Sequence, residues 1–423
     1  MGERPLRIAL LGYRGNMRCG GQGIYLWYLS RELARLGHRV DVFVGPPHPA
    51  PMPFARSVVE LPNQEFWGKW FLGNPALFRP ARGWLHLFEP INFYELCSSW
   101  LGFLPEPFAF SLRAWRAFVA RVRAGDGWDL CHDVQTLGFG CLGIQRLGVP
   151  MVSTIHHPLS VDRRLSFRRD RSFSEALGTM QFHPVGMQAF VARRLDRVIT
   201  SSQVSARQIE QDFGVARARI RDLANGLDTE LFRPDPEVSR NPSEILCVGR
   251  AGDPTKGVDT LIDALALLPR HATVTLVDQD HAEHAGRKRA RERGCADRLT
   301  VTGKVSEAEL VRLYNRATLV AVPSNFEGFG LPAAEAMACG TPVVASTAGA
   351  LPEVVGAGGG VLVPPRDPEA LAKGIRTLLE QPEARSALSA RSRERVVASF
   401  SWPAVARRTA DVYREVLDER ARR

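Results

Sequence analysis

Two glutamates lie eight positions apart in the stretch SNFEGFGLPAAEAMACG, residues 324–340. Glu327 precedes a phenylalanine flanked by glycines, and Glu335 lies among strong helix formers. An anion would repel a carboxylate beside it, so these two side chains are suited to bind hydroxyl groups on either side of a phosphate. We therefore interpret the stretch as a site for a polyol phosphate. The alternative is that Glu335 is an exposed acid in a first helical turn and Glu327 an ordinary loop residue.

The segments around the glutamates predict a strand, a tight loop and a helix. Residues 317–324 form an apolar, β-branched run typical of a buried strand, and the helix is expected at about 331–339. The first amides of such a helix point beyond the strand end, where the helix dipole favours an anion. The loop amides expected to join them are those of Gly328, Phe329 and Gly330.

A second loop supplies positive charge. In VGRAGDPTKG, residues 248–257, a predicted strand ends at Arg250 and Lys256 follows in a Gly/Pro loop before a helix. Two cations that converge at this strand end would neutralise a diphosphate. The alternative is that both are solvated surface cations.

The chain alternates predicted strands and helices, which is typical of parallel α/β domains. A first series comprises strands at 7–12, 39–45, 129–133, 149–157 and 196–202, with a helix at 24–36. A second series comprises strands at 244–250, 272–280, 299–305, 317–324 and 341–346. Turn residues and prolines place the linker within 225–244. We expect two Rossmann-like units, whose ligand crevices beyond the strand ends would face each other across an interdomain cleft.

The first unit offers weaker candidates. A glycine-containing loop, NMRCGGQG at 16–23, follows the first strand, but it is not G-x-G-x-x-G, and no acid follows strand two, so a dinucleotide is disfavoured. His156 and His157 end a strand, and neighbouring side chains on an extended chain point opposite ways, so at most one is expected to face the cleft.

No metal or cofactor is predicted. Asp278 and Asp280 form D-x-D with His281 and His284 nearby, but a polar turn is expected at a strand end in any case. The seven cysteines are scattered without a C-x-x-C pair, which favours buried thiols over disulfides or zinc ligands.

With these residues in place, the chain resembles the retaining glycosyltransferases of family 4, which have the GT-B fold. The resemblance covers nearly the full length and is most specific at E-x7-E, Glu327 to Glu335. Supporting matches are the Gly20-Gly21 loop, T-x-H at Thr154 to His156, NGLD at 225–228, VGR…KG at 248–257 and FSWPAVARRTADVY at 400–413. One departure is DQDHAEH after the second strand of the second unit, where relatives often have a glycine-rich turn.

The resemblance implies three parts of the chain. These are an acceptor-binding domain at 1–232 with an aromatic-rich insert at about 60–118, a donor-binding domain at 233–398, and a helix at 399–423 that crosses back to the first domain. It also implies a role for each site residue. Arg250 and Lys256 would bind the donor diphosphate, and Glu335 the ribose hydroxyls. The transferred sugar and a phosphate would be held by Glu327 and the amides of Phe329, Gly330 and Leu331, while His156 would contact the sugar and the Gly20-Gly21 backbone would approach the phosphate.

The implied activity is metal-independent, retaining transfer of a hexose from a UDP- or GDP-sugar to a hydroxyl acceptor. Two alternatives remain: another GT-B enzyme, either a nucleotide-sugar epimerase or a phosphorylase-like protein, and a basic nucleic-acid-binding protein. Only the net charge of +10 supports the last alternative, because the arginines are spread through helices and no binding motif occurs.

The acceptor is open: a lipid, a glycan or a small molecule. Residues 60–118 hold five of the eight Trp and nine of the 21 Phe. Residues 1–238 carry 29 Lys+Arg against 22 Asp+Glu, so +7 of the net charge lies there. Both features are compatible with peripheral membrane contact. For the aromatics we favour the core and lid of an inserted helical segment, and an aromatic small-molecule acceptor fits as well as a lipid. With no apolar run of signal-peptide or membrane-span length, we expect a cytoplasmic protein.

Overall fold

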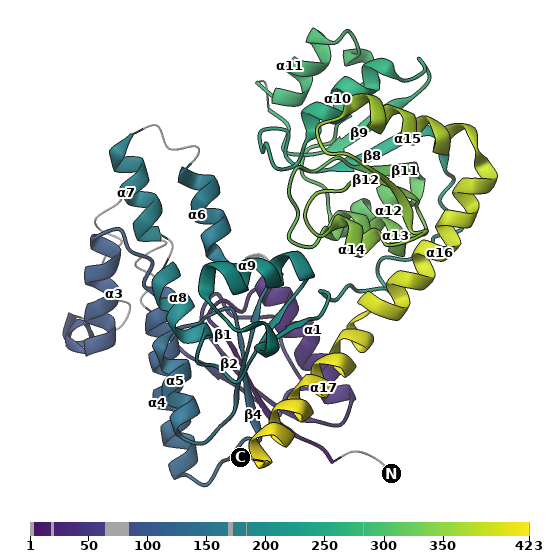
Figure 1. Ribbon diagram of the computed structural model, residues 1–423. Helices are drawn as coiled ribbons and strands as arrows, with labels where there is room; N and C mark the ends of the chain where they lie inside the picture. Colours follow the sequence, from purple (N-terminus) through teal and green to yellow (C-terminus); the bar gives the residue numbers. More distant parts are fainter. Residues whose placement is uncertain are drawn as a thin grey trace. The chain divides into compact units, whose positions relative to one another are not determined.

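The computed structural model describes residues 4–17, 21–63, 84–167, 172–182, 184–281 and 283–422. The chain forms two compact α/β units (Figure 1). The first comprises Met1–Ser201, Ser205–Leu223 and Val405–Arg423, and the second comprises Ser202–Val204 and Ala224–Ala404. This division of the chain falls nine residues before the boundary expected at 232/233.

The first unit is built on a seven-stranded parallel sheet in the order β3-β2-β1-β4-β5-β6-β7. Its strands are β1 (Arg7–Gly12), β2 (Arg39–Val44), β3 (Ser57–Glu60), β4 (Leu130–Val134), β5 (Met151–Ile155), β6 (Arg197–Thr200) and β7 (Ile220–Asp222). Its helices are α1 (Gly21–Arg35), α3 (Pro90–Trp100), α4 (Glu106–Arg123), α5 (Phe139–Arg146), α6 (Leu159–Phe167), α7 (Phe173–Phe182), α8 (Val185–Ala192) and α9 (Gln203–Phe213). The strand order reverses between β1 and β4, and ligands of such sheets bind where the order reverses.

The second unit has a six-stranded parallel sheet in the order β10-β9-β8-β11-β12-β13. Its strands are β8 (Asn241–Val248), β9 (Thr273–Val277), β10 (Leu299–Val301), β11 (Ala317–Val322), β12 (Val343–Ser346) and β13 (Gly360–Val363). Its helices are α10 (Val258–Leu267), α11 (Ala285–Glu292), α12 (Glu307–Arg316), α13 (Leu331–Ala338), α14 (Leu351–Val355), α15 (Pro368–Glu380) and α16 (Pro382–Phe400), followed by α17 (Trp402–Ala421). The order reverses between β8 and β11.

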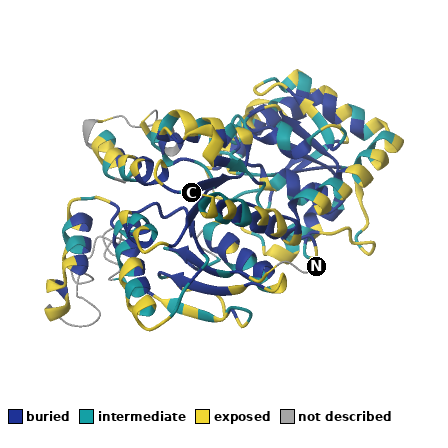
Figure 2. Cartoon of the chain, turned by 60° about the horizontal axis from the view of Figure 1, so that its bottom comes forward, coloured by how far each residue is buried: buried dark blue, intermediate teal, exposed yellow. Residues whose placement is uncertain are grey.

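Helices cover both faces of the second sheet, as the alternation of side chains along β8 shows. Ile245 and Cys247 pack into one core with α10 and α15, whereas Leu246 packs into another with α12, α13 and α16. Most residues of the central strands are buried in both units, and these stretches are dark blue in Figure 2. This burial explains why strands such as β11, ATLVAV, are nearly continuous apolar runs rather than alternating ones.

Helix α17 belongs to both units. Its residues Trp402–Ala404 lie with the second unit, and those from Val405 onward lie with the first. The ring of Trp402 packs where a side chain on Gly226 would stand, since a Cβ there would lie 2.2 Å from the indole. The polypeptide thus enters and leaves the second unit at adjacent positions.

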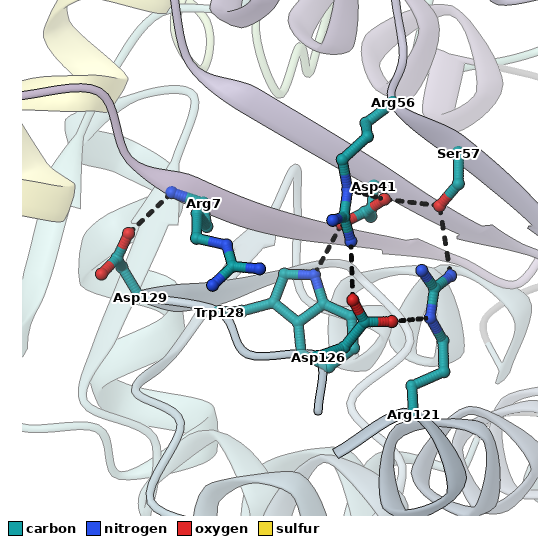
Figure 3. Close-up of polar contacts among 8 residues, drawn as sticks. All are labelled: Arg7, Asp41, Arg56, Ser57, Arg121, Asp126, Trp128 and Asp129. Atoms are coloured by element: carbon teal, nitrogen blue, oxygen red, sulfur yellow. Dashed lines mark hydrogen bonds and ion pairs between the residues drawn. The ribbon is translucent and has the colours of Figure 1, made fainter. Parts of the chain in front are cut away.

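A buried polar cluster near the amino ends of the first sheet is structural (Figure 3). Asp41 in β2 accepts hydrogen bonds from Arg56, from Ser57 and from the indole of Trp128 at 2.9 Å. Burial alone would raise the pKa of Asp41, but these donors outweigh it and hold the pKa below its ordinary value. Because the carboxylate is fully engaged far from the carboxyl ends of the strands, we assign it no catalytic role.

The burial of the cysteines and of the aromatic residues at 60–118 tests two expectations from the sequence. Of the six described cysteines, Cys97 is half-buried and the others are buried free thiols, so the expectation of buried thiols is confirmed for five. In the described part of the aromatic segment, Phe118 is fully buried, while Trp100 and Phe88 are 71% and 78% exposed. Core packing therefore explains only some of these aromatics. The part of the insert at 64–83 lies outside the described residues.

Candidate active site

Two loops meet at the carboxyl ends of β8 and β11, where the strand order of the second sheet reverses. The amide of Asn325 donates to the carbonyl of Thr255 at 2.7 Å, and its side chain donates to the carbonyl of Pro254 at 2.7 Å. Gly257 allows this approach, because a Cβ there would lie 2.1 Å from the carbonyl oxygen of Pro323, and its φ of +61° also favours glycine. The backbone thus holds the loop of Arg250 and Lys256 against the loop of Glu327.

Lys256 and Glu327 form an ion pair at this junction. Lys256 Nζ lies 2.8 Å from Glu327 Oε1, and the carboxylate also accepts a hydrogen bond from Ser324 Oγ at 2.8 Å. The Glu327 side chain is only 10% exposed and that of Lys256 29%, so water screens the pair less than it would at the surface. Sequence analysis placed both residues at one site but did not anticipate the direct contact.

The backbone of Glu327 is fixed as well. Its carbonyl accepts from the amide of Ala350 at 2.9 Å, and Gly349, with φ of +58°, approaches so closely that a Cβ would lie 2.1 Å from the same oxygen. These contacts fix the backbone from which the Glu327 side chain extends.

Arg250 extends from the end of β8 into solvent. Its side chain is 75% exposed and lies 3.6 Å from the carboxylate of Asp253 in the same loop. Arg250 thus shares a loop with Lys256, but its side chain is more exposed to solvent than that of Lys256.

Helix α13 begins directly after the Glu327 loop. Gly330 precedes it with φ of +101°, a conformation that side chains rarely adopt, and Leu331 is its first residue. Phe329 is buried, with its ring edge-on to Phe400 at 5.5 Å, so it anchors the loop in the core of the second unit. The helix ends at Ala338, one residue before its expected end.

Glu335 is half-buried within α13 and is not an exposed first-turn acid. Its Oε2 accepts a 2.7 Å hydrogen bond from the hydroxyl of Tyr314, a fully buried residue of α12. Burial raises the pKa of Glu335 to about 7, and the tyrosine only partly offsets this effect. The carboxyl group thus titrates near neutral pH, an unusual property that is more frequent at functional sites.

Both aspartates of the D-x-D segment, Asp278 and Asp280, bind neighbouring residues of the second unit. Asp278 Oδ2 accepts from the amide of Ala251 at 2.7 Å and contacts His284 Nε2 at 3.0 Å, while Asp280 pairs with Arg287. The other ring nitrogen of His284 caps α11 by accepting from its first amides. Among the described residues, no group of three His, Cys, Asp or Glu side chains is placed to hold a metal ion.

The candidate site residues of the first unit lie near the place where the strand order of its sheet reverses, between β1 and β4. His156 follows β5, is half-buried, and packs its ring edge-on against Tyr25 of α1 at 4.8 Å. His157 is also half-buried. Gly21 is the exposed first residue of α1, and Gly20 lies outside the described residues.

The structure thus brings Lys256, Glu327 and the start of α13 together in the second unit. Sequence reasoning missed two partners, Ser324 and Tyr314. Ser324 could have been suspected, because the expected strand at 317–324 ends there, three residues before Glu327. No local signal marks Tyr314, whose spacing of 21 residues from Glu335 spans the whole of β11.

Comparison with known proteins identifies the family of the chain. The family model described as "Glycosyltransferase Family 4" matches residues 19–231, and the model described as "Glycosyl transferases group 1" matches residues 228–395. Two Rossmann-like units with these matches define a glycosyltransferase of the GT-B class. The chain belongs to glycosyltransferase family 4.

Three relatives and two solved structures illustrate the similarity. The chain is 39% identical to an MMP alpha-(1->4)-mannosyltransferase of Mycolicibacterium hassiacum, over 97% of this chain and 98% of the relative. It is 30% identical to a glycogen synthase of Mycobacterium tuberculosis (93% and 91% covered) and to a D-inositol 3-phosphate glycosyltransferase of Saccharomonospora viridis (98% and 95% covered).

Among solved structures, sucrose-phosphate synthase from Thermosynechococcus elongatus matches with a TM-score of 0.66, 27% identity, and coverage of 98% of this chain and 100% of that one. Anabaena HepE, solved in complex with UDP, matches with the same TM-score at 20% identity, and the shared feature there is the fold (97% and 100% covered). In the described part of the chain, every helix is too short or too polar to cross a bilayer.

Proposed function

We propose that this enzyme transfers a mannosyl group from a nucleotide-diphosphate sugar to a hydroxyl of a mannoside acceptor, in α-(1→4) linkage and with retention of anomeric configuration. The similarity to the mannosyltransferase, 39% over nearly the full length of both chains, supports this choice of sugar and linkage. The donor is a UDP- or GDP-sugar.

The observation that carries the proposal is the Lys256–Glu327 ion pair at the strand ends of the second unit. Breaking the anomeric bond leaves negative charge on the diphosphate and positive charge on the sugar. In our proposal Lys256 and Arg250 stabilise the leaving diphosphate, and the amides of Phe329, Gly330 and Leu331 add donors from the start of α13. Glu327 lies beside the sugar, where its negative charge favours the developing cation.

The remaining roles follow the same charge argument. We assign Glu335 to the ribose hydroxyls, with Tyr314 orienting the carboxylate. We assign His156 to a contact with the sugar and the backbone at Gly21 to a contact with a phosphate. The two cations supply the charge that a metal ion supplies in other transferases, so the proposed reaction needs no metal.

A transfer assay tests the proposal. The protein is incubated with GDP-mannose or UDP-sugars, with and without a short α-mannoside, and both nucleoside diphosphate and sugar products are measured. We expect nucleoside diphosphate to form only when the acceptor is present, together with a longer mannoside. Conversion of the sugar nucleotide to an epimer without acceptor would instead identify an epimerase, and no reaction with any mannoside would refute the proposed acceptor.

A further inference from the structure

A glutamine side chain holds the backbone that carries His156. The parallel ladder between β4 and β5 ends at the pair Val134–Thr154. Beyond it, Gln135 Oε1 accepts a hydrogen bond from the amide of His156 at 3.0 Å, and Gln135 Nε2 donates to the carbonyl of His157 at 3.1 Å. One acceptor and one donor are the groups that a neighbouring strand would present. The side-chain amide thus continues the ladder by one step after the backbone of β4 has turned away.

The turn itself is conformationally costly. Gln135 has φ of +56° and Leu137 has φ of +50°, and neither is a glycine. Non-glycine residues with positive φ are strained, and they occur where surrounding contacts hold the backbone in that conformation. Such residues are concentrated at functional sites. Here the surroundings include Asp133, a fully buried carboxylate that accepts from the amide of Leu137 at 3.0 Å and from Ser153 Oγ at 2.9 Å. Gln135 itself is 4% exposed, so it is not placed to bind a ligand directly.

A separate set of contacts places the ring of His156. Its partner in the edge-on contact, Tyr25, has its hydroxyl 3.1 Å from Thr154 Oγ1. Thr154 Oγ1 lies 2.7 Å from Nε2 of the buried His132, whose Nδ1 lies 2.5 Å from the hydroxyl of Tyr413 in α17. Ser201 Oγ also donates to the carbonyl of His156, at 3.0 Å. The backbone and the ring of His156 are therefore held by different residues, and the one that holds the His156 amide, Gln135, has a strained backbone.

We propose that Gln135 is a positioning residue of the transfer reaction, which acts by fixing the backbone of His156 relative to the end of β5. The proposal rests on the proposed contact of His156 with the transferred sugar. The β4–β5 pairing is already complete at Val134 and Thr154. A side chain that served stability alone would therefore not require the strained, left-handed backbone of Gln135. The conformation is explained if it brings a side-chain amide into line with His156.

The variant Q135N separates positioning from stability. Asparagine adopts positive φ more readily than glutamine, but it is one methylene shorter and cannot span both bonds to the His156–His157 backbone. Two buried hydrogen bonds are lost while the positive φ becomes easier to adopt, so we expect a folded protein whose melting temperature is lower by a few degrees at most. We expect kcat to fall about 10- to 100-fold, the effect of small misplacements of reacting groups, and the donor KM to change by less than about threefold. Calorimetric affinity for the free nucleoside diphosphate should stay the same.

A matched control is Q145N in α5 of the same unit. Gln145 also donates hydrogen bonds, to the Arg194 carbonyl at 3.2 Å and to Asp196 at 3.0 Å, but these do not involve His156. Its kcat should stay within about twofold of the wild-type value. If Q135N does not fold, Q135E replaces it, since it keeps the length and the acceptor oxygen for the His156 amide and replaces the donor to His157 with an oxygen that repels that carbonyl.

A double-mutant cycle with H156A distinguishes the ways in which the idea can fail. We expect H156A to lower kcat, and Q135N to lower it by less than about twofold further in the H156A background. If H156A alone leaves kcat unchanged, the proposed role of His156 is wrong. If H156A lowers kcat but Q135N has no effect in the wild type, or has its full effect in the H156A background, Gln135 does not act through His156.

Discussion

The glutamine variant of Glu335 should be more stable than the wild type at high pH and yet bind nucleotide more weakly. Burial raises the pKa of this carboxyl to about 7, against 4.5 for an unperturbed glutamate. Between these values the folded protein keeps a proton that the unfolded chain has lost, so ionisation of Glu335 makes the free energy of unfolding fall as pH rises through this window. The E335Q variant would carry no such loss, and its amide oxygen can still accept from Tyr314.

The two pKa values give the magnitude. Ionisation of Glu335 costs the folded state about 1 kcal/mol at pH 5.5 and about 3 kcal/mol at pH 8. The advantage of E335Q over the wild type in denaturant unfolding should therefore grow by about 2 kcal/mol between these two pH values. The control is E394Q, an exposed position of α16, where the difference should stay constant with pH. In calorimetry at pH 8, E335Q should bind free nucleoside diphosphate at least about 10-fold more weakly.

Two outcomes would refute this reasoning. A stability difference that does not change with pH would mean that the pKa of Glu335 is not raised in the folded protein. An increased stability without loss of nucleotide affinity would mean that the burial is structural and that the ribose lies elsewhere.

Three further predictions concern the same site. R250A and K256A should each lower turnover by about 100-fold, the usual cost of one charge-stabilising group, while K373A on α15 should not; near-normal activity of both would remove the diphosphate assignment. E327Q should cut turnover but not lower the calorimetric affinity for free nucleoside diphosphate, because it removes a negative charge beside Lys256; a loss of affinity equal to that of E335Q would contradict the separate roles of the two glutamates. Transfer should survive excess EDTA, whereas complete loss restored by magnesium or manganese would bring Asp278 and Asp280 back into consideration.

The sequence predicted the core strands well because their signal is local. β1 has the expected bounds, and α13 differs by one residue, since an apolar run before it and a glycine after it mark its limits. The strands that were missed, β3, β7 and β13, are three or four residues long and partly exposed. A run that short, buried on one side only, cannot be distinguished from a loop.

The site was predicted at the level of loops rather than contacts. Lys256 and Glu327 are 71 residues apart, so only the strand order β8-β11 brings them together, and sequence periodicity does not give strand order. Gln135 had no sequence signal at all, because positive φ is normally sought at glycine or asparagine. The roles assigned to the site residues remain predictions that the experiments above test.

The most direct test of the central claim is the configuration of the bond that the enzyme makes. The purified protein is given an α-configured nucleotide sugar and a mannoside acceptor, and the anomeric centre of the isolated product is examined by nuclear magnetic resonance. Our account predicts an α-(1→4)-linked mannosyl product together with one equivalent of nucleoside diphosphate. A β-linked product would contradict retention, and release of free mannose without a new glycosidic bond would contradict transfer itself.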